Sequence, residues 1–146
     1  MKCIFYLFFS LSFFVASCQS HFNLRQEVAG LDGIQFIFYH QNKENDTIIK
    51  VTLKDKHYRR NFVNSLSIKN QENIDLKTFD KIGKVIFQRK NMNVVLLEGK
   101  IFKNKKQYYF YCQFQQKKYI KKINQNGIDL LDFAQQFPES VNALPQ

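Results

Sequence analysis

Alternating apolar and polar residues predict a β-hairpin early in the chain. Residues 34–41 and 47–54 each turn every second side chain to an apolar face, and residues 42–46 between them are polar, as in a turn. The apolar faces comprise Ile34, Phe36 and Phe38 in the first segment and Ile49, Val51 and Leu53 in the second. We therefore expect two antiparallel strands that bury one side of a sheet.

Residues 56–69 fit two periods, so helix and strand both remain open there. Helical spacing relates Tyr58, Phe62 and Leu66, whereas strand alternation relates Phe62, Asn64, Leu66 and Ile68. Further along, Asp75 predicts the N-cap of a short helix that ends at Gly83. The side chains expected to be buried by that helix are Leu76, Phe79 and Ile82.

The middle of the chain predicts an antiparallel meander of short strands. The expected strands are 85–87, 92–102, 107–115 and 119–123, separated by polar or charged turns such as 88–91 and 103–106. The continuous apolar run Val94-Val95-Leu96-Leu97 predicts a strand that is buried on both faces. In residues 107–115, alternation directs Tyr108 and Phe110 inward and Tyr109 and Tyr111 to the other side.

A final helix is predicted near the C-terminus. Residues 124–127 interrupt the strand pattern, Asp129 is placed to cap a helix, and Pro138 ends it. Its apolar stripe comprises Leu130, Phe133, Ala134 and Phe137. Amphipathic helices and a one-sided sheet each need a partner to bury their apolar faces. We therefore predict an α+β fold, a twisted antiparallel sheet of about five to six strands with one to three short helices. A small β-barrel with a closing helix is the alternative.

The first eighteen residues have the features of a secretory signal. One basic residue precedes the apolar segment 4–15, and small residues follow it. A helix of that length spans only about 18 Å, too short to cross a bilayer. The segment therefore predicts export from the cytoplasm.

The end of this signal, Val15-Ala16-Ser17-Cys18, resembles the lipobox of bacterial lipoproteins. The resemblance covers residues 1–18 only, and no family is identified for the rest of the chain. It implies removal of residues 1–17, attachment of lipid to Cys18 and a membrane anchor of two or three acyl chains such as palmitate. Gln19 in place of Asp favours the outer membrane, facing the periplasm. Ordinary secretory cleavage, which gives a secreted or cell-surface protein, is the alternative.

The predicted organisation is a signal peptide over 1–17, an anchor and tether over 18–33, and a single α+β domain over 34–146. Lipidation of Cys18 leaves Cys112 without a disulfide partner in the mature chain. Because Cys112 shares the apolar parity of Tyr108, Phe110 and Phe114, we expect it to be a small buried residue rather than a nucleophile.

No pattern in the sequence predicts catalysis, a metal or a cofactor. The three histidines, His21, His40 and His57, match no metal-ligand spacing, and phosphate-binding loops and nucleophile elbows are absent from the sequence. The carboxylate pairs Asp75/Asp80 and Asp129/Asp132 have the context of helix starts and solvated faces. We therefore expect a protein that is not an enzyme.

The positive charge of the chain indicates which kinds of partner the protein could bind. The 146 residues carry 22 Lys+Arg against 12 Asp+Glu, a formal net charge of +10, and residues 99–128 contain no acid. The lysines of this stretch are Lys100, Lys103, Lys105, Lys106, Lys117, Lys118, Lys121 and Lys122. They are candidates for a surface that binds an acidic protein or an anionic lipid, or for solvated lysines that protect sheet edges. Export argues against nucleic acid as the partner.

Three functions remain open at this point. The first is a lipid-anchored, non-enzymatic envelope module that recognises an anionic partner. The second is a periplasmic inhibitor or immunity lipoprotein that neutralises a toxin or hydrolase, and a cationic domain pairs naturally with an acidic effector. The third is a small enzyme whose site residues are dispersed along the chain.

Overall fold

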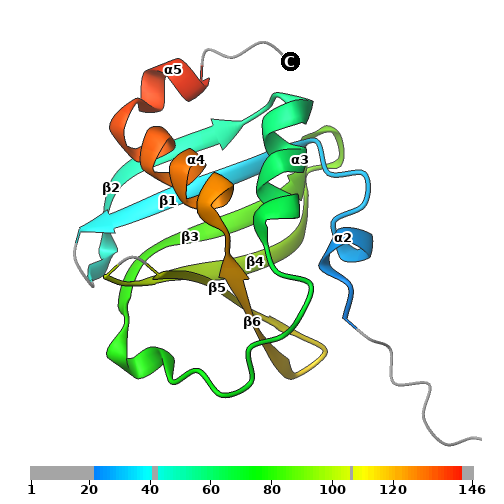
Figure 1. Ribbon diagram of the computed structural model, residues 1–146. Helices are drawn as coiled ribbons and strands as arrows, with labels where there is room; N and C mark the ends of the chain where they lie inside the picture. Colours follow the sequence, from blue (N-terminus) through cyan, green and yellow to red (C-terminus); the bar gives the residue numbers. More distant parts are fainter. Residues whose placement is uncertain (1–21, 41–42, 106, 143–146) are drawn as a thin grey trace, which may run out of the picture.

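Six antiparallel strands form one open, twisted sheet in the computed structural model, which describes residues 22–40, 43–105 and 107–142 (Figure 1). The sheet order is β2-β1-β3-β4-β5-β6. The strands are β1 (Gly33–His40), β2 (Lys43–Leu53), β3 (Asp80–Arg89), β4 (Val94–Asn104), β5 (Gln107–Phe114) and β6 (Lys117–Ile123). The α+β prediction is therefore confirmed, and the alternative of a closed barrel is wrong.

Helices cover one face of this sheet. They are α2 (Leu24–Glu27), α3 (Lys56–Ser65), α4 (Gln125–Gln136) and α5 (Pro138–Asn142), with short 3₁₀ turns at Leu76–Thr78 and Lys90–Met92. Figure 1 shows α3 and α4 in front of the central strands, with α5 next to β2. Because α3 joins β2 to β3 and both strands pair with β1, the connection crosses over β1 on the helical face.

The segment that the sequence left open, residues 56–69, is a helix followed by an extended stretch. The Asp55 carboxylate caps α3 by accepting hydrogen bonds from the amides of His57 and Tyr58 at 2.8 and 3.0 Å. The helix buries Phe62 and Val63. Leu66 then leaves the helix and forms an isolated β-bridge with Ile123.

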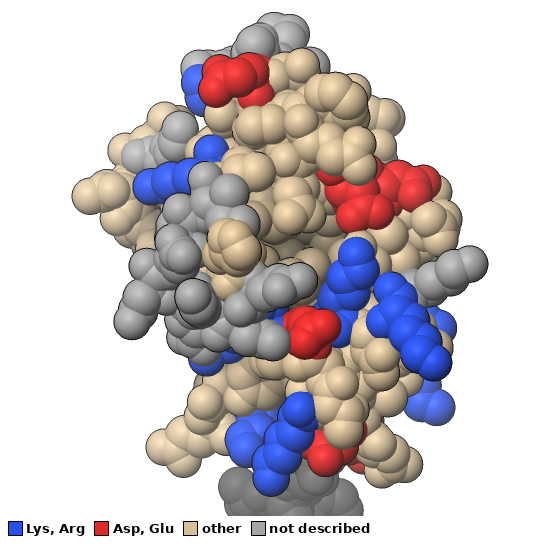
Figure 2. Space-filling view, turned by 90° about the vertical axis from the view of Figure 1, so that its left-hand side faces the viewer, with Lys and Arg blue, Asp and Glu red and all other residues tan. Residues whose placement is uncertain are grey.

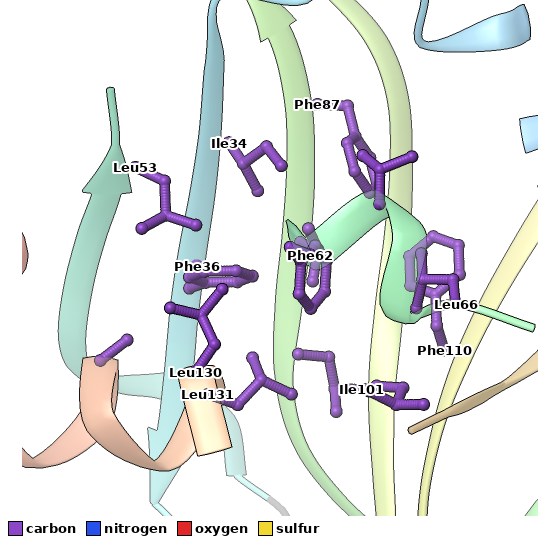
Figure 3. Packing of buried hydrophobic residues seen from close by; sticks show 14 of the residues in the cluster. Ile34, Phe36, Leu53, Phe62, Leu66, Phe87, Ile101, Phe110, Leu130 and Leu131 are labelled. Atoms are coloured by element: carbon purple, nitrogen blue, oxygen red, sulfur yellow. The ribbon is translucent and has the colours of Figure 1, made fainter. Parts of the chain in front are cut away.

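The core lies between the helices and the inward face of the sheet (Figure 3). Phe62 occupies its centre, with ring centroids 4.9 Å from Phe36 and 6.3 Å from Phe87. Leu130 and Leu131 of α4 pack beside it. Ile49 and Phe114, also predicted for the inward face, are partly buried, and the other alternating residues are buried: Ile34, Phe36, Phe38, Val51, Leu53, Tyr108, Phe110 and Cys112.

One predicted turn and one predicted helix are partly strand instead. The second hairpin strand begins at Lys43, within the predicted turn 42–46; residues 41 and 42 lie outside the described residues. The helix predicted after Asp75 is only a 3₁₀ turn, because the chain becomes extended at Phe79. Gly83 lies within β3, and a side chain there would come within 2.7 Å of the Ile37 carbonyl oxygen. Gly83 thus permits close strand pairing rather than ending a helix.

The run Val94-Val95-Leu96-Leu97 is not buried on both faces, so that prediction is wrong. Val94 and Val95 are 44% and 56% exposed, and Leu97 is buried. The reason is topological: the helices cover one face of the sheet, and the start of β4 extends from the β3–β4 turn beyond them.

The C-terminal helix starts earlier than predicted. Asn124 is its N-cap and accepts a hydrogen bond from the Gly127 amide at 3.2 Å, whereas Asp129 lies inside the helix. The buried face is Gly127, Leu130, Leu131 and Ala134. Phe133 and Phe137 are exposed and contact each other, so the predicted apolar stripe is only half correct.

The outer edge of β6 is covered by the chain that follows α3. The Ser67 and Gln71 amides donate to the carbonyls of Lys122 and Ile120, and the Ile120 amide donates to Asn70 Oδ1 at 2.7 Å. The Lys122 amide donates to Ser67 Oγ. Residues 66–71 therefore satisfy the strand edge that would otherwise be open to pairing.

Residues 22–32 run along one end of the sheet and belong to the folded domain. Leu24 and Val28 are buried in the main core, so the core begins within the predicted tether 18–33. Among the described residues, no helix is both long and apolar enough to cross a membrane.

Candidate basic cleft at the edge strand

The β6 edge forms one wall of a cleft of about 1060 Å³. The other walls are α2 with the residues before it and the segment that joins α3 to β3. Its apolar lining includes Phe22, Leu24, Val63, Leu66, Ile74 and Tyr119. Four basic residues, Arg25, Lys117, Lys118 and Lys121, also line it, against one acidic residue, Glu72. The arrangement suits a ligand or peptide that combines an apolar part with negative charge.

Phe22 connects this cleft to the N-terminal part of the chain. Its ring stacks on Tyr119 with centroids 4.1 Å apart and tilts against Phe114 at 5.2 Å. The three rings come from the chain before α2 and from β5 and β6. This aromatic contact anchors the start of the described chain beside the β5–β6 turn.

Lys121 lies at the base of the cleft and is only 3% exposed. Register pairs it with Phe110, which places it on the core side of β6. Its Nζ donates a hydrogen bond to the Ile68 carbonyl. The Ile68 side chain itself is 82% exposed. Burial lowers the pKa of Lys121, an effect that the neighbouring Cys112 partly opposes.

The buried Lys121 predicts a specific pH dependence of stability. Because its pKa is lowered in the folded state, the unfolded chain binds more protons between that lowered value and 10.5. The stability contributed by this site therefore rises with pH across that window. In urea unfolding at several pH values, Lys121→Met should lack this rise, so wild type gains stability relative to the variant toward pH 10. The exposed Lys122→Met is the control, and equal pH profiles for all three proteins would contradict a buried charge.

Cys112 is a structural residue in this arrangement, as the sequence predicted. It is 1% exposed, and burial raises the pKa of its thiol to about 12, with Lys121 acting in the opposite direction. A thiol with that pKa is protonated at neutral pH and is a poor nucleophile. Within the described residues it is a free cysteine.

The eight candidate lysines do not all lie on one surface. Lys118 and Lys122 are exposed on the helix-free side of β6, and Lys100 is partly buried on the same side of β4. Lys117 and Lys105 are exposed in or beside turns, and Lys106 lies outside the described residues, as does Cys18. Lys121 is buried, so it cannot contribute to an exposed basic surface in this structure.

Lys103 belongs to a different cluster, on the helical side of the sheet. Its Nζ lies 4.8 Å from the centroid of the Tyr108 ring, and the Tyr108 hydroxyl donates to Asp132 Oδ1 at 2.9 Å. The Tyr108 hydroxyl holds the pKa of Lys103 above its usual value against desolvation, and Asp132 adds to the rise; burial raises the pKa of Tyr108. The cluster fastens α4 to β5.

Acids from other elements interrupt the basic stretch seen in the sequence. Asp132 of α4 approaches Lys103, and Glu98, the residue just before the acid-free stretch, pairs with Lys84 of β3 at 2.7 Å. Figure 2 shows small groups of basic and acidic residues interspersed on the side of the molecule that carries the β4–β5 turn. The most uniformly basic part of the described chain is therefore β6, since β5, β6 and their turn contain no acid.

Three of the histidines and carboxylates noted in the sequence have local structural roles. Asp75 caps a 3₁₀ turn, and Asp129 accepts a hydrogen bond from Gln125 Nε2 at 2.7 Å. His57 Nε2 lies 3.0 Å from Asn61 Nδ2 on the same helix. No group of three or more His, Cys, Asp or Glu suited to a metal occurs in the parts of the chain that the structure describes.

The cleft itself was missed by sequence reasoning. The residues that form it come from segments about 100 positions apart, and Phe22 lies in a stretch interpreted as tether. The sequence contained one indication of this cleft. Lys117, Tyr119 and Lys121 are two positions apart, which places their side chains on the same side of β6. Comparison of the chain with protein families, with curated proteins and with solved structures finds no match.

Proposed function

We propose that the protein is a lipid-anchored envelope component that binds an anionic partner through β6 and its cleft and catalyses no reaction. The lipobox residues supply the anchor at Cys18. The observation that carries the binding role is the charge of the cleft, whose lining has four basic residues and one acidic. Of these four, Arg25, Lys117 and Lys118 are exposed and Lys121 is buried, and exposed Lys122 adds a further charge on the same edge strand.

Physical magnitudes favour such a site at a membrane surface. Each lysine near an anionic surface contributes about 1 kcal/mol, and salt screens the attraction beyond ~8–10 Å. An anchored protein meets neighbouring partners at high effective concentration, so a few such contacts suffice.

Replacing the exposed lysines of β6 tests the binding role. In the full lipidated protein, Lys117→Gln, Lys118→Gln and Lys122→Gln together should weaken partner binding at least about tenfold. Lys121 is left in place because it is buried and its replacement would disturb the fold. Binding is measured separately on phosphatidylglycerol vesicles and on detergent-solubilised envelope proteins. The first measurement reports an anionic lipid partner, and the second reports a protein partner.

The matched control removes the same charge at the opposite edge of the sheet. Lys50, Lys54 and Lys56 lie on or just after β2, far from β6 in strand order. Their replacement by Gln should leave binding within about twofold, since salt screens charges at that separation. Equal losses in both variants would show that net charge alone acts, and the β6 proposal would then be wrong.

The anchor is tested independently by mass spectrometry of the N-terminal peptide. We expect a diacylglyceryl modification on Cys18 and release of Cys18→Ala into the soluble fraction. An unmodified N-terminus at another residue would refute the anchor.

A further inference from the structure

One end of the sheet brings together the start of the described chain and two turns. In an antiparallel meander successive turns alternate between ends, so the β3–β4 and β5–β6 turns lie at the same end. Residues 22–32 run across that end, from Phe22 on Phe114 and Tyr119 to Ala29 beside Arg89. Figure 1 shows α2 and both turns on the right-hand side. We name this region, residues 22–32, 89–95 and 114–118, the N-terminal end of the sheet.

The β3–β4 turn presents three apolar side chains at this end. Met92, Val94 and Val95 are 67%, 44% and 56% exposed. Asn93 separates Met92 from Val94, and the three apolar residues form a short apolar tip at the turn and the start of β4 rather than isolated surface residues. The β5–β6 turn at the same end contributes exposed Lys117 and Lys118.

The apolar tip is held rigidly against residues 29–32. Arg89 Nη2 donates to the Ala29 carbonyl at 2.7 Å, and the Asn91 amide donates to Asp32 Oδ2 at 3.2 Å. The Asp32 amide in turn donates to the Gln88 carbonyl at 3.1 Å. The tip and the N-terminal segment therefore form one unit whose orientation is set together.

We propose that the N-terminal end of the sheet lies against the lipid bilayer, with Met92, Val94 and Val95 in the interfacial layer. The inference rests on the lipid anchor proposed above. Three residues separate Cys18 from Phe22, and the four extended Cα–Cα steps between them reach at most about 14 Å. The acyl chains on Cys18 thus keep this end within a short distance of the membrane.

The chemistry of this end fits a bilayer surface. Shallow apolar side chains enter the boundary between headgroups and acyl chains, while neighbouring lysines meet lipid phosphates. Both kinds of side chain are present at this end of the sheet. The apolar ones come from the β3–β4 turn and the lysines from the β5–β6 turn. By contrast, the helical face carries exposed Phe133 and Phe137 beside the acidic Asp129, a charge that anionic headgroups repel.

The absence of tryptophan from the chain allows a direct test. Val95→Trp introduces the sole tryptophan at the apolar tip, and Phe133→Trp introduces one on α4 as a control of similar exposure. Each lipidated full-length protein is reconstituted in vesicles that contain phosphatidylglycerol and lipids brominated on their acyl chains. We expect Val95→Trp to shift its emission to shorter wavelength and to be quenched by bromine, and Phe133→Trp to show neither change.

The outcomes separate this inference from the function on which it rests. Flotation with vesicles and the mass of the N-terminal peptide report the anchor, whatever the fluorescence shows. If the protein floats but Val95→Trp is unquenched, the orientation is wrong and the tip faces solvent or another protein. If Phe133→Trp alone is quenched, the helical face lies on the membrane and the inference is equally overturned.

Discussion

Truncation of Phe62 to Ala is expected to lower the free energy of unfolding by about 4 kcal/mol. The Phe62 ring is fully buried and contacts Phe36 edge to face, at 4.9 Å between centroids, and Phe87. Removing it leaves a cavity where α3 packs on the middle of the sheet. Urea unfolding followed by circular dichroism measures the change.

Phe133→Ala is the matched control for this truncation. The same atoms are removed from a side chain that is 40% exposed on α4, so the expected loss is about 1 kcal/mol or less. Because a domain of this size is stable by only about 5–15 kcal/mol, Phe62→Ala should also shift the midpoint strongly. Similar losses in the two variants would contradict the described packing of α3 on the sheet.

Gly127→Ala is expected to destabilise the protein by about 2 kcal/mol, against the usual effect of this change in a helix. In an open helical position the replacement stabilises by about 1 kcal/mol, because Ala has the higher helix propensity. Here an added Cβ would overlap Ser65 Oγ and lie 2.5 Å from Ile123 Cγ2. Ser65 is buried and its hydroxyl donates to the Phe62 carbonyl, so it has little freedom to move.

The neighbouring Asn126→Ala supplies the reference for this experiment. Asn126 is exposed in the same turn of α4, and its replacement should be neutral or stabilising by up to about 0.7 kcal/mol. Thermal unfolding of both variants gives the sign directly. A stabilised Gly127→Ala would show that α4 sits farther from α3 than described.

The alternating pattern of the strands was sufficient to predict the sheet and its inward face. A strand has a period of two whatever its neighbours, so Phe36, Val51 and Phe110 identify the buried side locally. Short turns make consecutive strands pair, which was sufficient to predict the hairpin of β1 and β2 and the meander from β3 to β6, whereas the sequence left an open sheet and a small barrel as alternatives. The chain crossing between β2 and β3 depends on residues 56–69, whose two periods could not be separated by spacing alone.

The errors occurred where tertiary packing decides burial. Val94 and Val95 have the composition of a doubly buried strand, but no layer covers that end of β4. Asp129 is a residue type that often caps helices, but Asn124 is the N-cap of α4 and lies earlier in the chain. Gly127, in the first turn of this helix, packs closely against Ser65. In both cases the deciding neighbour lies on a distant segment.

The candidate site was predictable as a list of lysines but not as a surface. Alternation in β6 assigns Lys118 and Lys122 to one side and Lys121 to the other. Burial of Lys121 depends on the Ile68 carbonyl, which is 53 residues away, and on the chain around it. The cleft likewise depends on Phe22, whose aromatic partners lie in β5 and β6.

The hydrogen bonds that cover β6 limit how a partner can be recognised. Many binding modules capture a peptide by adding it as a further strand, with main-chain bonds that tolerate many sequences. In this protein residues 66–71 already hold the outward amides of Ile120 and Lys122. A partner at this edge must therefore be recognised by side chains. The selection of partners then depends on their charge and shape rather than on an extended backbone that could join the sheet.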